Sequence, residues 1–246
     1  MTVAGAIIGV LMGLFGVGGS SLATPVLSLL GVADLAAVAS PLPATIPSAI
    51  LAVVPYVRSR DARPRAAAWT SLGGVPGVIT GALLSRAVGG PALLVASGVF
   101  LVLAGLRVLK PISAEALASG ERRRKNRPLL VAATFAVGLF TGLLANGGAF
   151  ILVPLYMLVF GLPLRQAVGT TLLVVATFSI PSLATHWALG HIDWAVAGAL
   201  APGQLAGAAA GGRLAKRFDP ARLRRSFAWF VIAFGAAFTV FRVLRG

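Results

Sequence analysis

The stretch that decides the fold is Gly9–Pro25, GVLMGLFGVGGSSLATP. It returns as Gly138–Pro154, GLFTGLLANGGAFILVP, with its main glycines, one leucine and the closing proline in register. One residue of shift later, Ala37–Ser40 (AVAS) aligns with Ala167–Thr170 (AVGT). Ordered matches at a nearly constant offset predict two copies of one repeat, which is a recurring device of secondary transporters.

Composition predicts that both copies lie in a membrane. Of the 246 residues 58% are hydrophobic and 11% are charged, whereas a soluble domain carries about 25% charged residues. Apolar stretches recur that are long enough to cross about 30 Å of hydrocarbon. The sequence therefore predicts an all-α polytopic integral membrane protein. The expected apolar segments are Val3–Leu30, Leu35–Val57, Ala66–Ala87, Pro91–Leu109, Leu129–Val159, Gln166–Leu189, Trp194–Ala215 and Phe227–Leu244.

We expect repeat 1 at residues 1–110 and repeat 2 at residues 129–246, joined by a basic loop at residues 111–128. The first segment of each repeat is too long for one ordinary span and too short for two, and a glycine-rich break interrupts it. This predicts a re-entrant helical hairpin followed by three transmembrane helices in each copy. An odd number of spans inverts the second copy relative to the first. A kinked full span is the alternative.

Charge favours the hairpins. If all eight segments crossed, the basic loops Arg58–Arg65 and Arg213–Arg225 would lie on opposite sides. With hairpins, all 21 Lys and Arg residues except Arg86, Arg242 and Arg245 share one side, as the positive-inside rule requires. The prediction is a multi-pass protein of a bacterial inner membrane. The same clustering accounts for the net charge of +15 without a nucleic-acid partner.

The two glycine breaks are the best candidates for a binding site. Non-helical backbone at membrane depth is tolerated where it is buried in protein or lines a cavity, and the half-helix after each break presents its positive N-terminal end. Such a site suits a compact oxyanion. The alternative is that the glycines only permit close helix packing. The candidates are Gly18, Gly19, Ser20 and Ser21 in the first copy and Asn146, Gly147 and Gly148 in the second.

Further candidate substrate-binding residues lie in later segments. Ser40 and Thr45 lie where prolines are expected to kink the second segment and expose hydroxyls near the bend, and Thr170 and Thr171 hold comparable places. Each hydroxyl could instead bond its own backbone. Gln204 is the only amide inside its segment, and it could equally bridge two helices.

Tyr56 and His186 align across the repeats and are candidates for the transport pathway. Tyr56 could instead belong to an interfacial aromatic belt, and His186 could be structural. The rows Gly73/Gly77/Gly81 and Gly203/Gly207/Gly211 have four-residue spacing and predict helix-packing faces.

No acidic residue lies deep in any segment, so the membrane-embedded carboxylates of proton-coupled pumps are missing. The absence of cysteine excludes thiolate chemistry and a cysteine metal site, and we expect no metal and no cofactor. A negative cell interior drives a dianion outward by roughly 4–5 kcal/mol per 100 mV. Electrogenic export therefore needs no further energy source.

At the two glycine motifs, and at the turn Gly190–Trp194 (GHIDW), the chain resembles the TauE/SafE sulfite exporter family. The resemblance covers essentially the whole chain. It implies transport of sulfite, sulfonates or related organosulfur anions, with Gly18, Gly19, Gly147 and Gly148 at family motif positions. The chain departs from the family pattern at Ser20, Ala145, Asn146 and Ala149, where further glycines are typical, so the substrate stays open.

Three alternatives remain from the sequence. An anion channel or facilitator would have the same duplicated half-helices. An intramembrane serine hydrolase would need Ser20 or Ser21 within reach of His186. The glycine faces could also pack between two protomers, which leaves a homodimer open.

Overall fold

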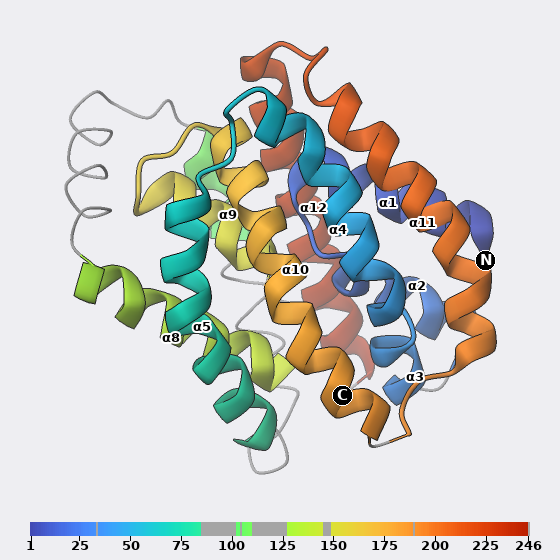
Figure 1. The fold of residues 1–246 in the computed structure, drawn as a ribbon. Coiled ribbons are helices and arrows are strands. Elements are labelled where there is room, and N and C mark those ends of the chain that lie inside the picture. Colours follow the sequence, from blue (N-terminus) through green and yellow to red (C-terminus); the bar gives the residue numbers. More distant parts are fainter. Residues whose placement is uncertain are drawn as a thin grey trace.

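The computed structural model describes residues 1–32, 34–84, 102–103, 105–109, 127–144, 149–188 and 190–245. Every regular element in these ranges is an α-helix (Figure 1), which confirms the all-α prediction. The helices with bounds are α1 Thr2–Phe15, α2 Gly19–Leu29, α3 Asp34–Ala39, α4 Leu42–Arg58, α5 Pro64–Leu84, α8 Arg127–Leu144, α9 Ala149–Leu158, α10 Leu164–Ala188, α11 Trp194–Leu214 and α12 Pro220–Arg245. Arg86, most of Pro91–Leu109, most of the loop at 111–128 and the candidates Asn146, Gly147 and Gly148 lie outside the described residues.

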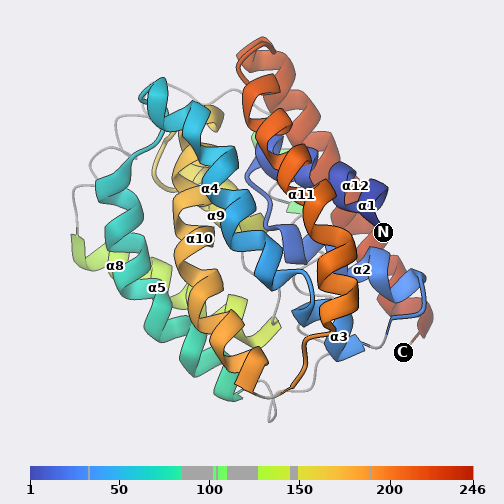
Figure 2. The same ribbon diagram turned by 45° about the vertical axis from the view of Figure 1, so that its right-hand side comes forward.

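Within the described ranges, α10 is long and apolar enough to cross a membrane by length and composition, with 25 residues, or about 37 Å. The helices α1 and α4 are shorter apolar helices. Figure 2 shows α4 and α10 in the middle of the molecule, with α1, α2 and α11 on one side and α5 and α8 on the other.

The first two predicted segments are each divided into two helices. The first breaks at Gly16, which has a left-handed φ of 69° and donates its N–H to the carbonyl of Met12, a common way to end a helix. The second breaks at Ser40–Pro41 into α3 and α4. We expected a kinked helix there, and that expectation was wrong. Pro41 and Pro43 lack the N–H groups that would carry the helix across this point.

Glycines bring the backbone of α1 directly against that of α11. A β-carbon on Gly13 would lie 2.5 Å from the carbonyl oxygen of Ala208, and one on Gly207 would overlap the carbonyl of Ala6. The row at 203, 207 and 211 is therefore a packing face, as predicted. The helices run parallel, because Gly5 faces Leu200 and Gly13 faces Gly212.

The pair α5 and α8 packs in the same way. A β-carbon on Gly73 would lie 2.5 Å from the carbonyl oxygen of Val131, and one on Gly138 would overlap the backbone of Gly74. The first helix of each predicted repeat thus packs against a glycine face from the other half of the chain.

The chain reverses direction between α1 and α2. In α1, Gly9 lies against Gln204 of α11, and Gly13 lies further along, against Gly212 of α11. Gly19, the first residue of α2, lies back at Gln204. The turn at residues 16–18 therefore carries the chain back by about two helical turns of α11.

Two turns that lie 130 residues apart in sequence have the same hydrogen bonds. After α4, the N–H of Asp61 donates to the carbonyl of Tyr56 at 2.8 Å, and Arg60 has a φ of 59°. After α10, the N–H of His191 donates to the carbonyl of His186 at 3.0 Å, and Gly190 has a φ of 69°. The likeness of the two halves thus extends to local backbone geometry at these turns.

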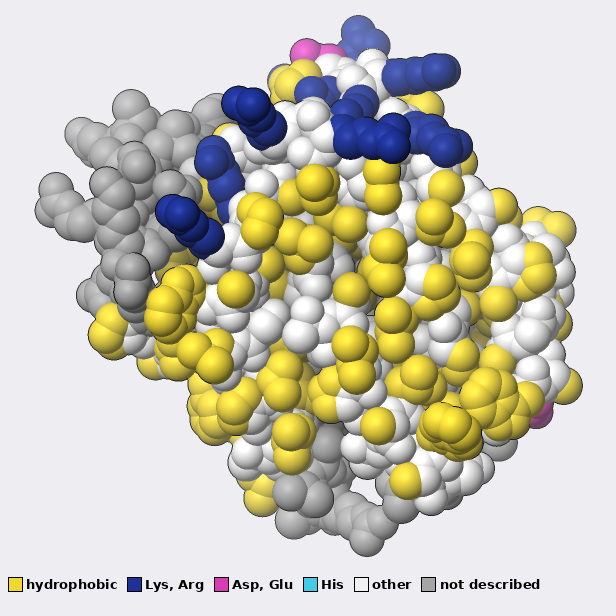
Figure 3. Space-filling view, in the orientation of Figure 1, with side chains coloured by type: hydrophobic (Ala, Val, Ile, Leu, Met, Phe, Trp, Pro, Cys, Tyr) yellow, Lys and Arg dark blue, Asp and Glu magenta, His cyan; other side chains and the backbone are white. Residues whose placement is uncertain are grey.

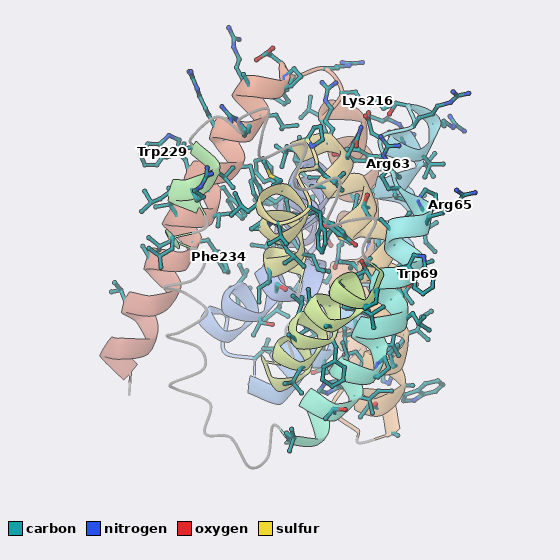
Figure 4. All side chains as sticks on the ribbon, turned by 90° about the vertical axis from the view of Figure 1, so that its left-hand side faces the viewer. Arg63, Arg65, Trp69, Lys216, Trp229 and Phe234 are labelled. Atoms are coloured by element: carbon teal, nitrogen blue, oxygen red, sulfur yellow. The ribbon has the colours of Figure 1, made fainter. Side chains whose placement is uncertain are left out.

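Basic residues from three parts of the chain meet at one end of the molecule. The Arg165 guanidinium donates to the carbonyls of Lys216 at 3.2 Å and Phe218 at 2.6 Å, and Nε of Arg63 donates to Gln166 at 3.2 Å. Figure 3 shows Lys and Arg side chains gathered at one end of the view, and Figure 4 shows Arg63, Arg65 and Lys216 together at that end.

Away from that end, hydrophobic side chains are spread over the visible face among backbone and other atoms (Figure 3). At the α10–α11 turn, Trp187 and Trp194 are 64% and 56% exposed and pack edge to face. Basic residues at one end and exposed tryptophans near the other are the pattern of a protein with two membrane interfaces.

We expect Gly207→Ala to lower the thermal stability of the protein in detergent, by about 1–3 kcal/mol, because its β-carbon would force apart two touching backbones. Gly198→Ala, on the same helix, is the control, since a β-carbon there meets nothing within 4 Å. That control should be neutral or slightly stabilising. Equal melting temperatures for the two variants would contradict the close packing of α1 on α11.

Candidate functional site

Three helices meet at Gly19, where α2 begins. A β-carbon on Gly19 would overlap Nε2 of Gln204 from α11 and lie 3.1 Å from Oγ1 of Thr45 from α4. With the Gln204 side chain in this position there is no room for a β-carbon, and the half-helix begins directly against a buried amide. The first N–H groups of a helix have no partner inside the helix, and they carry a partial positive charge.

The Gln204 amide has a defined orientation. Its Nε2 donates to Oγ1 of Thr45 at 3.3 Å, and this hydroxyl donates its only hydrogen to the carbonyl of Pro41 at 2.9 Å. Because the Thr45 hydrogen is used, the nitrogen and not the oxygen of the amide must face it. The Gln204 side chain is fully buried, and its Oε1 has no hydrogen-bond partner.

Two serine hydroxyls add unused hydrogen-bonding capacity. Ser20 follows Gly19 in α2, and Ser48 lies three residues after Thr45 on α4, a spacing that puts both side chains on one helix face. Both side chains are buried and neither Oγ has a partner. Unpaired buried polar atoms cost about 1–3 kcal/mol each. Gly19, Thr45 and Gln204 are in contact, and we group with them Ser20, the chain neighbour of Gly19, and Ser48, which shares the α4 face of Thr45. We call these five residues the Gln204 cluster.

The second copy has a different chemistry at the equivalent place. Gly148, the counterpart of Gly19, lies outside the described residues, but most of its expected surroundings are described. At the offset of 130, Gln204 corresponds to Gly74 and Ser48 to Phe178. A β-carbon on Gly74 would overlap the Phe178 ring. An aromatic ring therefore fills, in one half, the position that a polar pair holds in the other.

Ser40 and Thr170 are not brought to Gly19. Oγ of Ser40 accepts the N–H of Asp193 at 3.0 Å, and Oγ1 of Thr170 accepts the N–H of Arg63 at 3.2 Å. The two accepting residues lie 130 residues apart in sequence, and so do the two donating residues. Both hydroxyls are buried, so the expectation of exposed hydroxyls near a bend was wrong. They stabilise the turns that precede α11 and α5.

Among the remaining candidates, Gly18 and Ser21 are buried beside Gly19, and the N–H of Ser21 donates to the Gly18 carbonyl at 3.1 Å. Thr171 is buried on α10, and its Oγ1 has no partner.

Tyr56 is fully buried, and its hydroxyl donates to the carbonyl of Gly13 at 2.8 Å. It satisfies a free carbonyl at the C-terminal end of α1, so the alternative of an interfacial belt was wrong, and its place on the transport pathway stays a prediction. His186 lies in the last turn of α10, with its Nδ1 3.2 Å from Nδ1 of His191.

The hydrolase alternative finds no support in this geometry. Gln204 and the adjoining α2 start lie about 15 Å along α11 from Trp194, near the turn that carries His186. That is beyond hydrogen-bond reach of a serine in the Gln204 cluster. Among the described residues there is also no group of three His, Asp or Glu side chains that could hold a metal ion.

Sequence reasoning named Gln204 but missed Ser48 and the contrast with Phe178. The signal was present in the internal alignment. Positions at which one copy is polar and the other is glycine or aromatic, such as 204 against 74 and 48 against 178, mark the places where the two halves differ in chemistry.

Comparisons with known proteins agree with the resemblance at the glycine motifs. A family model described as "Sulfite exporter TauE/SafE" matches residues 1–238. A Xylella fastidiosa (strain 9a5c) protein named "Probable membrane transporter protein" is 28% identical over 237 residues, covering 93% of this chain and 90% of that protein. The "Probable membrane transporter protein YunE" of Bacillus subtilis is 24% identical over 242 residues, covering 89% of each.

A "Probable membrane transporter protein MJ0441" from Methanocaldococcus jannaschii is 34% identical over 112 residues, covering 43% of this chain and 42% of that protein. No solved structure matches the chain. With the family match extending over nearly its whole length, the chain belongs to the sulfite exporter TauE/SafE family of membrane transporters.

Proposed function

We propose that this protein is a secondary transporter that exports small sulfur-containing anions, such as sulfite or sulfonates, across a bacterial inner membrane. The observation that carries the proposal is the start of α2 against the buried and partly unpaired Gln204 cluster. The family match supports the transporter class and the sulfur chemistry.

The chemistry of the Gln204 cluster suits an oxyanion. The N–H groups of Gly19 and Ser20 at the start of α2, the hydroxyls of Ser20 and Ser48 and the second hydrogen of Nε2 are all donors. None of the five residues of the cluster is charged. A site made of dipoles attracts an anion without a permanent counter-ion, so the anion can also leave again, as transport requires.

The cluster also contains one acceptor. Oε1 of Gln204 needs a donor, which a fully deprotonated sulfite or sulfonate group cannot supply. A hydrogen-bearing anion, such as hydrogensulfite or a sulfonate with a hydroxyl group, would satisfy both the donors and this acceptor. We therefore place hydrogen-bearing anions first among the substrates to be tested.

We propose that the two halves form inverted repeats, each beginning with a re-entrant hairpin. Three observations support this topology. The chain reverses between α1 and α2, the glycine-packed pairs join α1 to α11 and α8 to α5, and basic residues of the α4–α5 turn, the start of α10 and the α11–α12 turn lie at one end. With all crossings complete, the first and last of these turns would lie on opposite sides of the membrane.

A carrier is favoured over an open channel. The side chains of Ser20, Thr45, Ser48 and Gln204 are between 0% and 1% exposed, so the cluster is closed from both sides. An open channel would need a continuous water-filled path past these residues. A carrier passes through such a closed state between its outward-open and inward-open states.

The function is tested by efflux of radiolabelled sulfite from proteoliposomes with an imposed membrane potential. We expect the efflux to saturate with sulfite concentration and to increase when the interior is negative. Added sulfonates should inhibit it by competition. A panel of hydrogen-bearing and hydrogen-free anions then ranks the substrates. A flux that never saturates would indicate a channel, and no anion flux from folded protein would exclude the proposal.

Replacing the polar pair by its counterpart from the other half should abolish transport and preserve the fold. The variant Gln204→Gly/Ser48→Phe installs the glycine–phenylalanine pair that the protein already packs at positions 74 and 178. We expect at least about a hundredfold loss of flux, equivalent to roughly 2.7 kcal/mol of lost substrate interaction, with a melting temperature close to that of the wild type. Gln166→Ala, which removes a glutamine at the basic end, is the control and should retain flux. Normal flux in the double variant would remove the cluster from the pathway.

The hairpin can be tested directly, because the natural chain contains no cysteine. Single cysteines at Thr2 and Gly31 should react with a membrane-impermeant maleimide from the same side, outside the cell. A cysteine at Ser59 should be protected until the membrane is opened. Labelling of positions 2 and 31 from opposite sides would show that α1 and α2 form a full crossing.

A further inference from the structure

A pocket of about 330 Å³ lies between α4 and α11 at the basic end of the molecule. Its lining combines two kinds of residue. Arg58, Arg213 and Lys216 bring three positive charges, while the rest of the wall is apolar. The apolar residues are Leu51, Val54, Pro55 and Ala209. No carboxylate is among the lining residues.

The shape of this pocket follows from close packing beside it. A β-carbon on Gly212 would lie 2.5 Å from the carbonyl oxygen of Ala52, so α4 and α11 touch there through their backbones. Three residues before Gly212, on the same face of α11, Ala209 contributes only a methyl group to the wall. A hollow therefore remains beside the helix contact, and the long basic side chains surround one end of it.

The acidic side chains described at this end of the molecule make their hydrogen bonds with groups outside the pocket lining. Oδ2 of Asp61 accepts the hydroxyl hydrogen of Ser59, and Oδ2 of Asp219 accepts the N–H groups of Ala221 and Arg222 at the start of α12. Arg58 and Arg213 are exposed. The site thus has an excess of positive charge that an anionic partner would balance.

The apolar part of the pocket faces outward. Leu51 is 40% exposed and Val54 is 37% exposed, both on α4. Soluble anions gain nothing from such a wall, whereas a molecule with a charged head and hydrocarbon chains fits both parts. Arg213 is also about 13 Å along α11 from Gln204, so the pocket is separate from the Gln204 cluster.

We propose that this pocket binds the phosphodiester headgroup of an anionic phospholipid from the cytoplasmic leaflet, with the acyl chains along Leu51 and Val54. Basic pockets between transmembrane helices on the cytoplasmic side are suited to such headgroups. The proposal depends on the membrane orientation described above but not on the identity of the transported anion.

Native mass spectrometry of the delipidated protein in a neutral detergent tests the proposal. The probes are phosphatidylglycerol and phosphatidylcholine with the same acyl chains. We expect phosphatidylglycerol to bind the wild-type protein at least about tenfold more tightly than phosphatidylcholine. The variant Arg58→Gln/Arg213→Gln/Lys216→Gln should lose at least about tenfold in affinity for phosphatidylglycerol, since each cation contributes about 1 kcal/mol near an anionic surface.

The matched control is Arg65→Gln/Arg222→Gln/Arg225→Gln, which removes the same charge from exposed positions outside the pocket and should bind phosphatidylglycerol as the wild type does. Equal losses in the two triple variants would mean diffuse attraction and overturn the proposal. Equal binding of both lipids would overturn it too, as would displacement of phosphatidylglycerol by millimolar inorganic phosphate, which would indicate a soluble-anion site. If the triple variant does not fold, Lys216→Gln alone should still weaken binding about fivefold, and an unchanged affinity would contradict the assignment.

Discussion

The direct contact between the backbones of α1 and α11 determines where everything at the start of the chain lies. Because glycine leaves no side chain between them, α1 follows α11 as far as Gly212, where the hydroxyl of Tyr56 donates to the carbonyl of Gly13. The left-handed turn at Gly16 then returns the chain to Gln204. The position of the α2 N-terminus, and with it the proposed anion site, follows from this packing.

The two halves share their packing and their turns but not their chemistry. Glycine faces join α1 to α11 and α8 to α5, and Ser40 and Thr170 hold equivalent turns. At the centre the halves differ, with Gln204 in one and the Gly74–Phe178 contact in the other. Among the described residues, the duplicated scaffold therefore carries a polar cluster in one half and an aromatic contact at the corresponding place in the other.

Much of the fold could be predicted because it is periodic or marked by breaks. The apolar segments, the glycine faces and the division at Gly16 all have local signals. Single residues of the site could be predicted but not their contact. Gly19 and Gln204 come from distant parts of the chain, and no local sequence pattern indicates that they meet. The hydroxyls of Ser40 and Thr170 looked like ligands because a sequence does not show which backbone N–H groups will lie opposite them.

The partner of α1 is made long after α1 itself. The Thr2 hydroxyl bonds the carbonyl of Ala199, 197 residues later, which at about 5–20 residues per second is a delay of roughly 10–40 s during synthesis. With 14 residues, α1 is about 21 Å long, short of the roughly 30 Å that a stable span requires. The N-terminal helix therefore waits, without its permanent place in the membrane, until almost the whole protein has left the ribosome.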